Sequence, residues 1–354
     1  MTVAIAAAGT GGHVYPALAI AAALESRGVP RDSILFLGGD RFEAGAVPAA
    51  GYRFAGFELT RLHRRLTVDN LRIPFVVNRS ADAMAEELRR SEVTVLLAMS
   101  GYVTVPAAVA AGRAGVAFVV HEQNSDPTLA VRFGARRAVF TLLGLPGNSE
   151  RLPRSELVGN PLRPMLADFD RSAIRARARA AYGLPFDGPV VGILGGSQGA
   201  QVLNAAAKAI AMAAGAPVLH LTGPAAHGLG DVTDPGLPWT RLAFEPQMHN
   251  FYAAVDLVVC RAGAMTVSEL AATGTPAVFV PLERVRQAAN ARVLTSVGGA
   301  EMVPQDEIRR LPDVVARLVG DAPGRSAMAK ACAATARPDA AQVVASRLLE
   351  AAGG

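Results

Sequence analysis

Two glycine-rich turns, each following a short apolar segment, occupy corresponding places in the two halves of the chain. The first is residues 9–13 (GTGGH), after the apolar segment 3–7, and the second is residues 195–199 (GGSQG), after the segment 189–194. A glycine turn between a strand and a helix lets the backbone approach a ligand, and the helix N-terminus that follows favours anionic groups. The pair predicts two domains that each present a ligand-binding edge to a cleft.

Short apolar segments alternate with amphipathic or alanine-rich segments along the chain, which predicts parallel sheets with helices on both faces. A length of 354 residues suits two domains of common size. We expect a first domain over residues 1–160, a second over 161–339, and a C-terminal helix within 340–354 that could return to the first domain. Strands are expected at 3–7, 33–37, 93–97, 117–120, 138–141, 189–194, 217–221, 257–260 and 277–280, and helices at 16–27, 172–182 and 340–352.

The composition is that of a packed globular protein, with 51% apolar and 18% charged residues. The net charge of +5 suits an anionic membrane surface or a phosphorylated substrate, and no dense basic tract with interleaved aromatic residues favours nucleic acid. The cysteines, Cys260 and Cys332, do not form a disulfide framework, which indicates a reducing compartment. We therefore expect a cytoplasmic protein with peripheral membrane contact only.

Polar residues follow three of the expected strands of the first domain. His13 falls at a predicted helix start, where its imidazole could take a proton from a hydroxyl group or orient a phosphate, although a capping or packing histidine is the simpler interpretation in isolation. Residues 99–103 (MSGYV) form another tight strand-to-helix turn, and residues 121–124 (HEQN) come directly after the strand 117–120. Because ligands bind at the carboxyl ends of parallel strands, these groups predict a site for a hydroxyl-rich substrate.

The second domain offers a helix start after the strand 257–260. Gly263 permits a tight turn, and the amides of residues 264–266 could face a diphosphate. Glu269 could accept hydrogen bonds from ribose hydroxyls, or it could simply stabilise the helix dipole.

Metal binding has little support, because the histidines and cysteines show no ligand spacing. Asp168 and Asp170 form a D-x-D string of the kind that holds a divalent ion, but Asp170 is better explained as the N-cap of the helix that follows. The basic and apolar stretch 61–79 suits an anionic membrane or an ordinary amphipathic helix equally well.

The chain resembles the MurG family, whose members transfer N-acetylglucosamine from UDP-N-acetylglucosamine to the lipid-linked muramyl-pentapeptide of peptidoglycan synthesis. The resemblance covers nearly the whole chain, in the family's order and spacing. The matching strings are GTGGHVYP (9–16), GDRFE (39–43), SGYV (100–103), HEQN (121–124), VGNPLR (158–163), GGSQGA (195–200) and CRAGAMTVSELA (260–271).

The resemblance implies a GT-B fold of two Rossmann-like domains and an inverting transferase without an obligatory metal, a divalent cation being at most an assistant. The partners would be a UDP-sugar and a lipid-linked phosphorylated acceptor at the inner face of the plasma membrane, where the stretch 61–79 would contact lipid. His13 or Glu122 would be the catalytic base. The acceptor would be bound by Thr10, Gly11, Gly12, Tyr102 and Asn124, and the donor by Arg163, Ser197, Gln198, Gly199, Phe244, Arg261, Ala264, Met265, Thr266, Glu269, Gln287 and Asn290.

The chain departs from the family pattern at Ser100, Val105, Val131 and the short basic loop 282–286. These differences lie in the donor-sugar and acceptor regions, so a paralogue that uses another UDP-sugar or acceptor is one alternative. A UDP-N-acetylglucosamine 2-epimerase and a non-catalytic UDP-sugar-binding protein are the alternatives from other classes.

Overall fold

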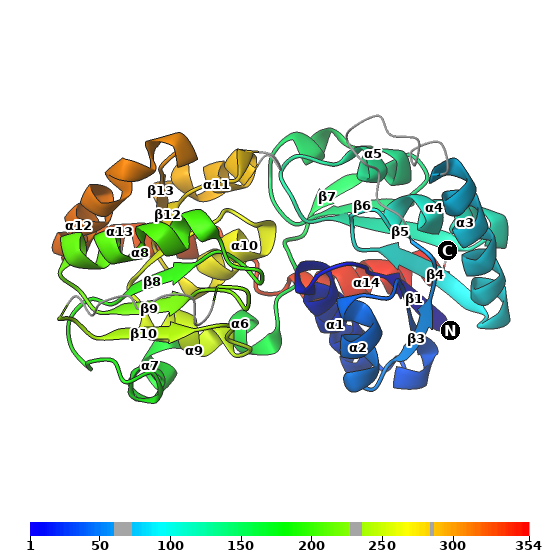
Figure 1. The fold of residues 1–354 in the computed structure, drawn as a ribbon. Helices are drawn as coiled ribbons and strands as arrows, with labels where there is room; N and C mark the ends of the chain where they lie inside the picture. Colours follow the sequence, from blue (N-terminus) through cyan, green and yellow to red (C-terminus); the bar gives the residue numbers. More distant parts are fainter. Residues whose placement is uncertain (60–72, 227–235, 284–286, 354) are drawn as a thin grey trace. The chain divides into compact units, whose positions relative to one another are not determined.

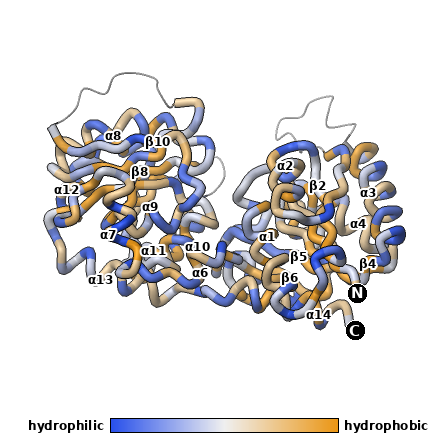
Figure 2. Tube along the Cα trace, turned by 90° about the horizontal axis from the view of Figure 1, so that it is seen from below, coloured by the Kyte–Doolittle hydropathy of each residue, from blue (hydrophilic) through white to orange (hydrophobic). Residues whose placement is uncertain are grey.

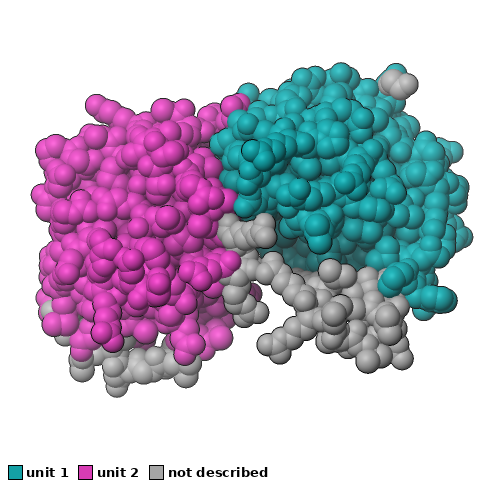
Figure 3. Space-filling view, turned by 90° about the horizontal axis from the view of Figure 1, so that it is seen from above, with its two compact units in different colours: residues 1–163, 339–354 teal, residues 164–338 magenta. Residues whose placement is uncertain are grey.

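The computed structural model describes residues 1–59, 73–226, 236–283 and 287–353, which form two compact units (Figure 1). Unit 1 contains residues 1–163 and 339–354, and unit 2 contains residues 164–338 (Figure 3). The sequence placed the corresponding boundaries at 160 and 339. The chain thus leaves unit 1 once and returns to it with its last helix.

Unit 1 is built on a seven-stranded parallel sheet with the strand order β3-β2-β1-β4-β5-β6-β7. The strands are β1 (Thr2–Ala6), β2 (Ile34–Gly38), β3 (Arg53–Gly56), β4 (Val93–Ala98), β5 (Ala117–Glu122), β6 (Phe140–Leu143) and β7 (Ser155–Leu157). The helices are α1 (Gly11–Ser26), α2 (Phe42–Ala49), α3 (Ile73–Arg90), α4 (Thr104–Ala114), α5 (Leu129–Ala135) and α14 (Ala340–Gly353), with 3-10 turns η1 (Arg31–Ser33) and η3 (Asn148–Arg151).

Alternate residues of the central strand β1 belong to two separate hydrophobic cores. Val3 and Ile5 pack with residues of α1 and α14 on one face, whereas Ala4 and Ala6 pack with residues of α3, α4 and α5 on the other. Because successive strand side chains point to opposite faces, this arrangement gives a sheet covered on both sides. Figure 1 shows α14 (red) beside α1 (blue), so the end of the chain completes the first core.

Unit 2 contains a six-stranded parallel sheet with the order β10-β9-β8-β11-β12-β13. The strands are β8 (Val191–Leu194), β9 (Val218–Leu221), β10 (Trp239–Leu242), β11 (Leu257–Cys260), β12 (Ala277–Phe279) and β13 (Ala300–Met302). The helices are α6 (Pro164–Ala167), α7 (Arg171–Ala181), α8 (Gln201–Ala214), α9 (Met248–Ala254), α10 (Ala264–Thr273), α11 (Gln287–Thr295), α12 (Leu311–Gly320) and α13 (Ala322–Ala333), with a 3-10 turn η5 (Gln305–Arg310). The predicted class, two parallel α/β domains, is confirmed.

Two expectations about the elements need correction. The first helix begins at Gly11 and not at Pro16, so the glycine turn forms its first residues. Strand β5 continues through Glu122, because His121 and Glu122 pair with Leu142 and Leu143 of β6. The sequence also missed the edge strands β3, β7, β10 and β13, whose half-exposed residues lack a continuous apolar run.

Hydrophobic residues concentrate in the strands, whereas helix α3 alternates between hydrophilic and hydrophobic positions (Figure 2). Of the helices within the described ranges, none is long and apolar enough to cross a membrane.

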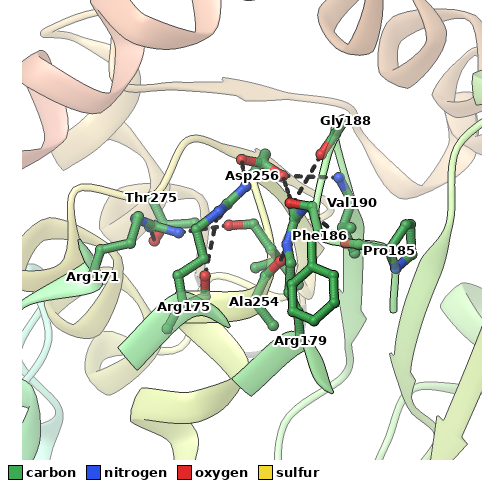
Figure 4. Close-up of polar contacts among 12 residues, drawn as sticks. Arg171, Arg175, Arg179, Pro185, Phe186, Gly188, Val190, Ala254, Asp256 and Thr275 are labelled. Atoms are coloured by element: carbon green, nitrogen blue, oxygen red, sulfur yellow. Dashed lines mark hydrogen bonds and ion pairs between the residues drawn. The ribbon is translucent and has the colours of Figure 1, made fainter. Parts of the chain in front are cut away.

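Three arginines on one face of α7 bind the C-terminal end of α9 (Figure 4). Arg175 and Arg179 each donate to Asp256 at 2.7 Å, and Arg179 also donates to Ala254 O at 3.0 Å. The Arg179 side chain is only 1% exposed, and Asp256 also accepts from the amide of Val190. Backbone carbonyls and one carboxylate thus satisfy a buried guanidinium and fasten α7 to the sheet.

Replacing Asp256 by Ala should destabilise the protein strongly, because Arg179 would keep its charge in a buried place without an ion-pair partner. We expect the free energy of unfolding, measured by urea denaturation, to fall by about 3–5 kcal/mol. The matched control is Glu301→Ala, whose partner Arg317 is 55% exposed; it should cost less than about 1 kcal/mol. Equal losses in the two variants would contradict this assignment.

Candidate active site

Four of the loops with predicted site residues lie where each sheet reverses its winding direction. In unit 1 the chain runs from β1 outward to β2 and β3, and then crosses to β4 on the other side of β1. In unit 2 the same reversal separates β8 from β11. Ligands of open α/β sheets bind at such switch points, outside the carboxyl ends of the strands. The turns that follow β1 and β4, and those that follow β8 and β11, are therefore the candidate sites.

A proline inside α1 couples the first turn of the helix to the loop after β5. Pro16 has no N–H to donate to the carbonyl oxygen of Gly12, four residues earlier. The side-chain amide of Gln123 donates to this oxygen at 2.8 Å. The segment HEQN (121–124) is thus bonded to the segment GTGGH (9–13) through the carbonyl oxygen to which the proline cannot donate.

His13, the third residue of α1, faces the turn after β4. A Cβ atom added to Gly101 would lie 3.4 Å from Nε2 of His13, an ordinary contact distance, so the imidazole lies directly against this turn; glycine is favoured at position 101 by its φ of +75°. The neighbouring Ser100 is buried and adopts a left-handed conformation with φ +58°, which is uncommon for a residue other than glycine. Its hydroxyl donates to Oε1 of Glu122 at 3.3 Å.

The polar string HEQN spans the last two residues of β5 and the two that follow, and its first three residues are buried. His121 and Glu122 are fully buried and Gln123 nearly so. His121 Nε2 contacts Gly159 O at 3.0 Å, and Glu122 Oε1 accepts from the backbone N and the side-chain Nδ2 of Asn124 at 2.8 and 3.0 Å. Burial raises the pKa of the Glu122 carboxyl, and its hydrogen bonds oppose this rise. Such a carboxyl is better placed to shape the loop than to meet a substrate.

The remaining acceptor residues lie on these same loops. Thr10 is exposed directly before α1, and Gly11 and Gly12 are its first two residues. Tyr102 is partly buried and packs against the core beneath α3, α4 and α5. The structure thus brings the predicted acceptor residues and His13 together at one switch point.

Glu43 is a site residue for which the sequence suggested no role. Its buried carboxylate accepts hydrogen bonds from the amide of Gly9 at 2.9 Å and from that of Gly39 at 3.0 Å. It therefore fixes the start of the glycine turn. The signal that could have found it is the string GDRFE, which the resemblance includes.

In unit 2, the glycine turn after β8 packs backbone to backbone against the end of β9. Gly199 has φ +75°, and a Cβ atom there would lie 2.1 Å from Thr222 O. Asn204 of α8 donates to the same carbonyl oxygen at 2.9 Å. Ser197 and Gln198 are exposed at the tip of this turn.

The turn after β11 leads directly into α10. Gly263 is the N-cap residue of this helix, and it has no side chain that could accept a hydrogen bond. The amides of Ala264, Met265 and Thr266 have no acceptor within the helix either. Uncapped amides at a helix start suit a phosphate group. Glu269 lies on the next turn of the helix, and its Oε2 accepts a hydrogen bond from the Tyr252 hydroxyl at 2.8 Å.

Phe244 is 47% exposed on the loop after β10. The next residue, Glu245, accepts hydrogen bonds at 2.6 Å from the Tyr182 hydroxyl and from the amide of Gln247. The Glu245 carboxylate thus holds the loop after β10 in place, and the neighbouring ring of Phe244 lies at the surface.

The other predicted donor residues are engaged within the protein. Arg261 donates to Val280 O at 2.8 Å and to Gln305 Oε1 at 2.7 Å. Asn290 is buried and donates to Ala262 O at 3.2 Å. Gln287 accepts from the amide of Leu282 at 2.9 Å, and residues 284–286 lie outside the described part of the chain.

Arg163 is the exception among the predicted donor residues. It is the last residue of unit 1 before the chain enters unit 2, and its guanidinium lies 5.0 Å from the ring centre of Tyr15.

Within the described ranges, no three His, Cys, Asp or Glu side chains are grouped so that they could hold a metal ion. Asp170 accepts from the amides of Ser172 and Ala173 at 2.9 and 3.2 Å, which confirms its predicted role as the N-cap of α7.

Comparisons with known proteins agree with this architecture. The glycosyltransferase family 28 N-terminal domain matches residues 3–141, and the glycosyltransferase family 28 C-terminal domain matches residues 190–344. A solved structure of MurG from Acinetobacter baumannii has a TM-score of 0.73 and 25% sequence identity, covering 99% of both chains. A glycotransferase of kitacinnamycin, at 18% identity, shares the fold with a TM-score of 0.70. The chain is a glycosyltransferase with the GT-B fold.

Curated relatives identify the family. The chain is 41% identical, over 99% of its length and 98% of the relative, to a protein of Nocardioides sp. named UDP-N-acetylglucosamine–N-acetylmuramyl-(pentapeptide) pyrophosphoryl-undecaprenol N-acetylglucosamine transferase. A protein of the same name from Thermobifida fusca is 38% identical, over 100% of this chain and 95% of the relative. The chain belongs to the MurG family.

The bond between Gln123 and Gly12 predicts a specific coupling. Gln123→Ala should lower the free energy of unfolding by about 1–3 kcal/mol, because a partly buried carbonyl loses its donor. In a Pro16→Ala background the new amide can donate to Gly12, so the same substitution should cost at least about 1 kcal/mol less. The control background is Pro48→Ala, an exposed proline in α2, in which the cost should not change. Equal costs in all three backgrounds would show that the proline does not create the need for Gln123.

Two buried histidines predict a loss of stability in acid. Burial lowers the pKa of His121 and of His220 to about 4, below the value of 6.5 for a solvated histidine. Between these values the unfolded chain binds a proton at each site that the folded chain does not, so stability falls as the pH falls from about 6.5 toward 4. The raised pKa of Glu122 partly offsets this loss of stability. As the pH falls, the folded chain protonates this carboxyl at a higher pH than the unfolded chain does, which favours the folded state.

Replacing either histidine by Gln should reduce the slope of unfolding free energy against pH by about 1.4 kcal/mol per pH unit within this window. Denaturation curves at a series of pH values measure the slope. An unchanged slope in either variant would mean that the folded protein protonates that histidine readily.

Proposed function

We propose that this enzyme transfers N-acetylglucosamine from UDP-N-acetylglucosamine to a lipid-diphosphate-linked muramyl-pentapeptide, with inversion at the anomeric carbon. The observation that carries the proposal is the paired set of glycine turns at the switch points of two parallel sheets, in a chain whose curated relatives bear the name of this reaction. Donor and acceptor functions are divided between the two units in the proposal.

Unit 2 holds the donor. The exposed turn of Ser197 and Gln198 and the first amides of α10 contact the diphosphate, where a helix start stabilises negative charge. Glu269 accepts hydrogen bonds from the ribose, and the exposed ring of Phe244 flanks the uracil. As the glycosidic bond to UDP breaks, these fixed amides stabilise the charge that develops on the leaving diphosphate. No metal is obligatory in this scheme, although a divalent cation could assist.

Unit 1 supplies the acceptor side. His13 takes the proton from the attacking hydroxyl of the acceptor, because its imidazole lies at the switch point between two loops whose backbones are fixed. Glu122 is proposed to position the loop of Asn124 rather than to act as the base, since it is fully buried.

The acceptor carries a lipid, so we also propose that unit 1 contacts the anionic inner face of the plasma membrane. Support comes from the described start of α3, where Phe75 is 83% exposed and Arg79 is exposed beside it. Large exposed apolar groups near arginines suit a lipid surface. Residues 61–72 of the predicted patch lie outside the described part of the chain.

A donor-by-acceptor assay tests the reaction. The enzyme is given UDP-N-acetylglucosamine or UDP-glucose together with the lipid-linked muramyl-pentapeptide or a simpler prenyl-phosphate sugar. Transfer of N-acetylglucosamine to the muramyl lipid is expected. Transfer only from or to another substrate would favour a paralogue, conversion of the donor without any acceptor would favour an epimerase, and UDP binding without turnover would favour a non-catalytic protein.

In the same assay, His13→Ala should lower kcat by about 10²–10⁴-fold, the usual contribution of general acid–base catalysis. Because the proposed donor residues all belong to unit 2 except Arg163, the affinity for UDP measured by calorimetry should not change. A variant that retains wild-type turnover would remove His13 from the mechanism. A variant that loses UDP affinity as well would point to general misfolding, which thermal melting can verify.

A further inference from the structure

A buried hydrogen bond connects α9 with the proposed ribose-binding residue. The Tyr252 hydroxyl donates to Oε2 of Glu269 at 2.8 Å. Tyr252 is fully buried in α9, whereas Glu269 is partly exposed in α10. A buried tyrosine hydroxyl requires a partner, and a carboxylate can accept from several donors at once. Glu269 can therefore bind Tyr252 and a ligand hydroxyl together.

The backbone of Tyr252 is itself held by a hydrogen bond from Arg171 of α7. Arg171 donates to the carbonyl oxygens of Tyr252 and Val255, each at 2.6 Å. The same guanidinium donates to Thr273 O at 3.2 Å, at the C-terminal end of α10. Burial lowers the pKa of Arg171 to about 10, which still leaves it charged at neutral pH. One cation thus sets the position of α9 relative to α10.

A short series of hydroxyl groups continues this contact to Glu269. Arg171 donates to Thr275 Oγ1 at 2.7 Å, and this hydroxyl lies 2.8 Å from Thr273 Oγ1. Thr273 in turn donates to the backbone oxygen of Glu269 at 2.8 Å. Thr273 thus holds the main chain of Glu269, and Tyr252 holds its side chain. Both of these residues are in turn hydrogen-bonded to Arg171.

We infer that Tyr252 is a positioning residue that holds the Glu269 carboxylate ready for the ribose hydroxyls of a uridine nucleotide. The inference rests on the proposed function, in which Glu269 contacts that ribose. A carboxylate fixed before binding loses less side-chain freedom when the nucleotide arrives. The contribution depends on the ribose hydroxyls alone, so it disappears for a nucleotide that lacks them.

Calorimetric binding of two nucleotides to the full-length protein tests the inference. The ligands are UDP and 2′,3′-dideoxyuridine diphosphate, and the variant is Tyr252→Phe, which removes only the hydroxyl. We expect the Kd of UDP to rise about three- to tenfold, as for the loss of one hydrogen bond, and that of the dideoxy analogue to stay the same. The matched control is Tyr52→Phe, which removes the hydrogen bond from Tyr52 to Glu25 in unit 1 and should leave both Kd values unchanged.

The outcomes separate the inference from the function on which it rests. If the wild type prefers UDP over the dideoxy analogue and Tyr252→Phe keeps that preference in full, Tyr252 has no positioning role and the donor site stands. If the wild type binds both nucleotides equally, the ribose role of Glu269 is wrong and the inference falls with it. Reduced stability of the variant would weaken both nucleotides alike, so the ratio of the two Kd values remains informative.

Discussion

The carbonyl oxygen of Gly12 is the acceptor on which the first candidate site depends. Because Pro16 cannot donate to it, the oxygen needs a partner from elsewhere in the fold, and Gln123 provides one. That bond draws the end of β5 against the start of α1. The neighbouring contacts of Glu122 with Ser100, and of His13 with Gly101, then arrange the turn after β4 around the same point. The turns that follow β1, β4 and β5 are thus joined to one another by contacts near the start of α1.

The loops of unit 2 are held in place by different interactions from those of unit 1. Its glycine turn is fixed by backbone contact at Thr222, and its helix start at Gly263 leaves amides for a ligand. The residues behind the site are charged and buried, with Arg171 and Arg179 bound mainly to carbonyl oxygens. A guanidinium that satisfies several carbonyls at once can join elements that share no regular hydrogen-bonding pattern. Helix α10, which carries several of the proposed donor residues, is therefore joined to α9 by hydrogen bonds of Arg171.

The alternation of apolar segments and the glycine turns predicted both sheets and the loops that carry the site, because periodicity and turn chemistry are local signals. The edge strands and the burial of HEQN were not predictable in this way, since both depend on which strand lies next to which. The tertiary partners of Glu43 and Tyr252 were invisible for the same reason, as each bond joins residues on different elements. The sequence predicted the loops of the candidate site, and the packing determines which of their side chains are buried.

Helix α14 has a consequence for the order in which the protein is made. Val344, Ala345 and Leu348 belong to the same core as Val3 and Ile5, so unit 1 contains residues that are synthesised after the whole of unit 2. Unit 2, which is continuous from 164 to 338, can bury its own core while its N-terminal neighbour still lacks a helix. Domains usually fold in order of synthesis. Here the unit that is synthesised first is completed only after unit 2, and until then the apolar residues that α14 covers have no partner from that helix.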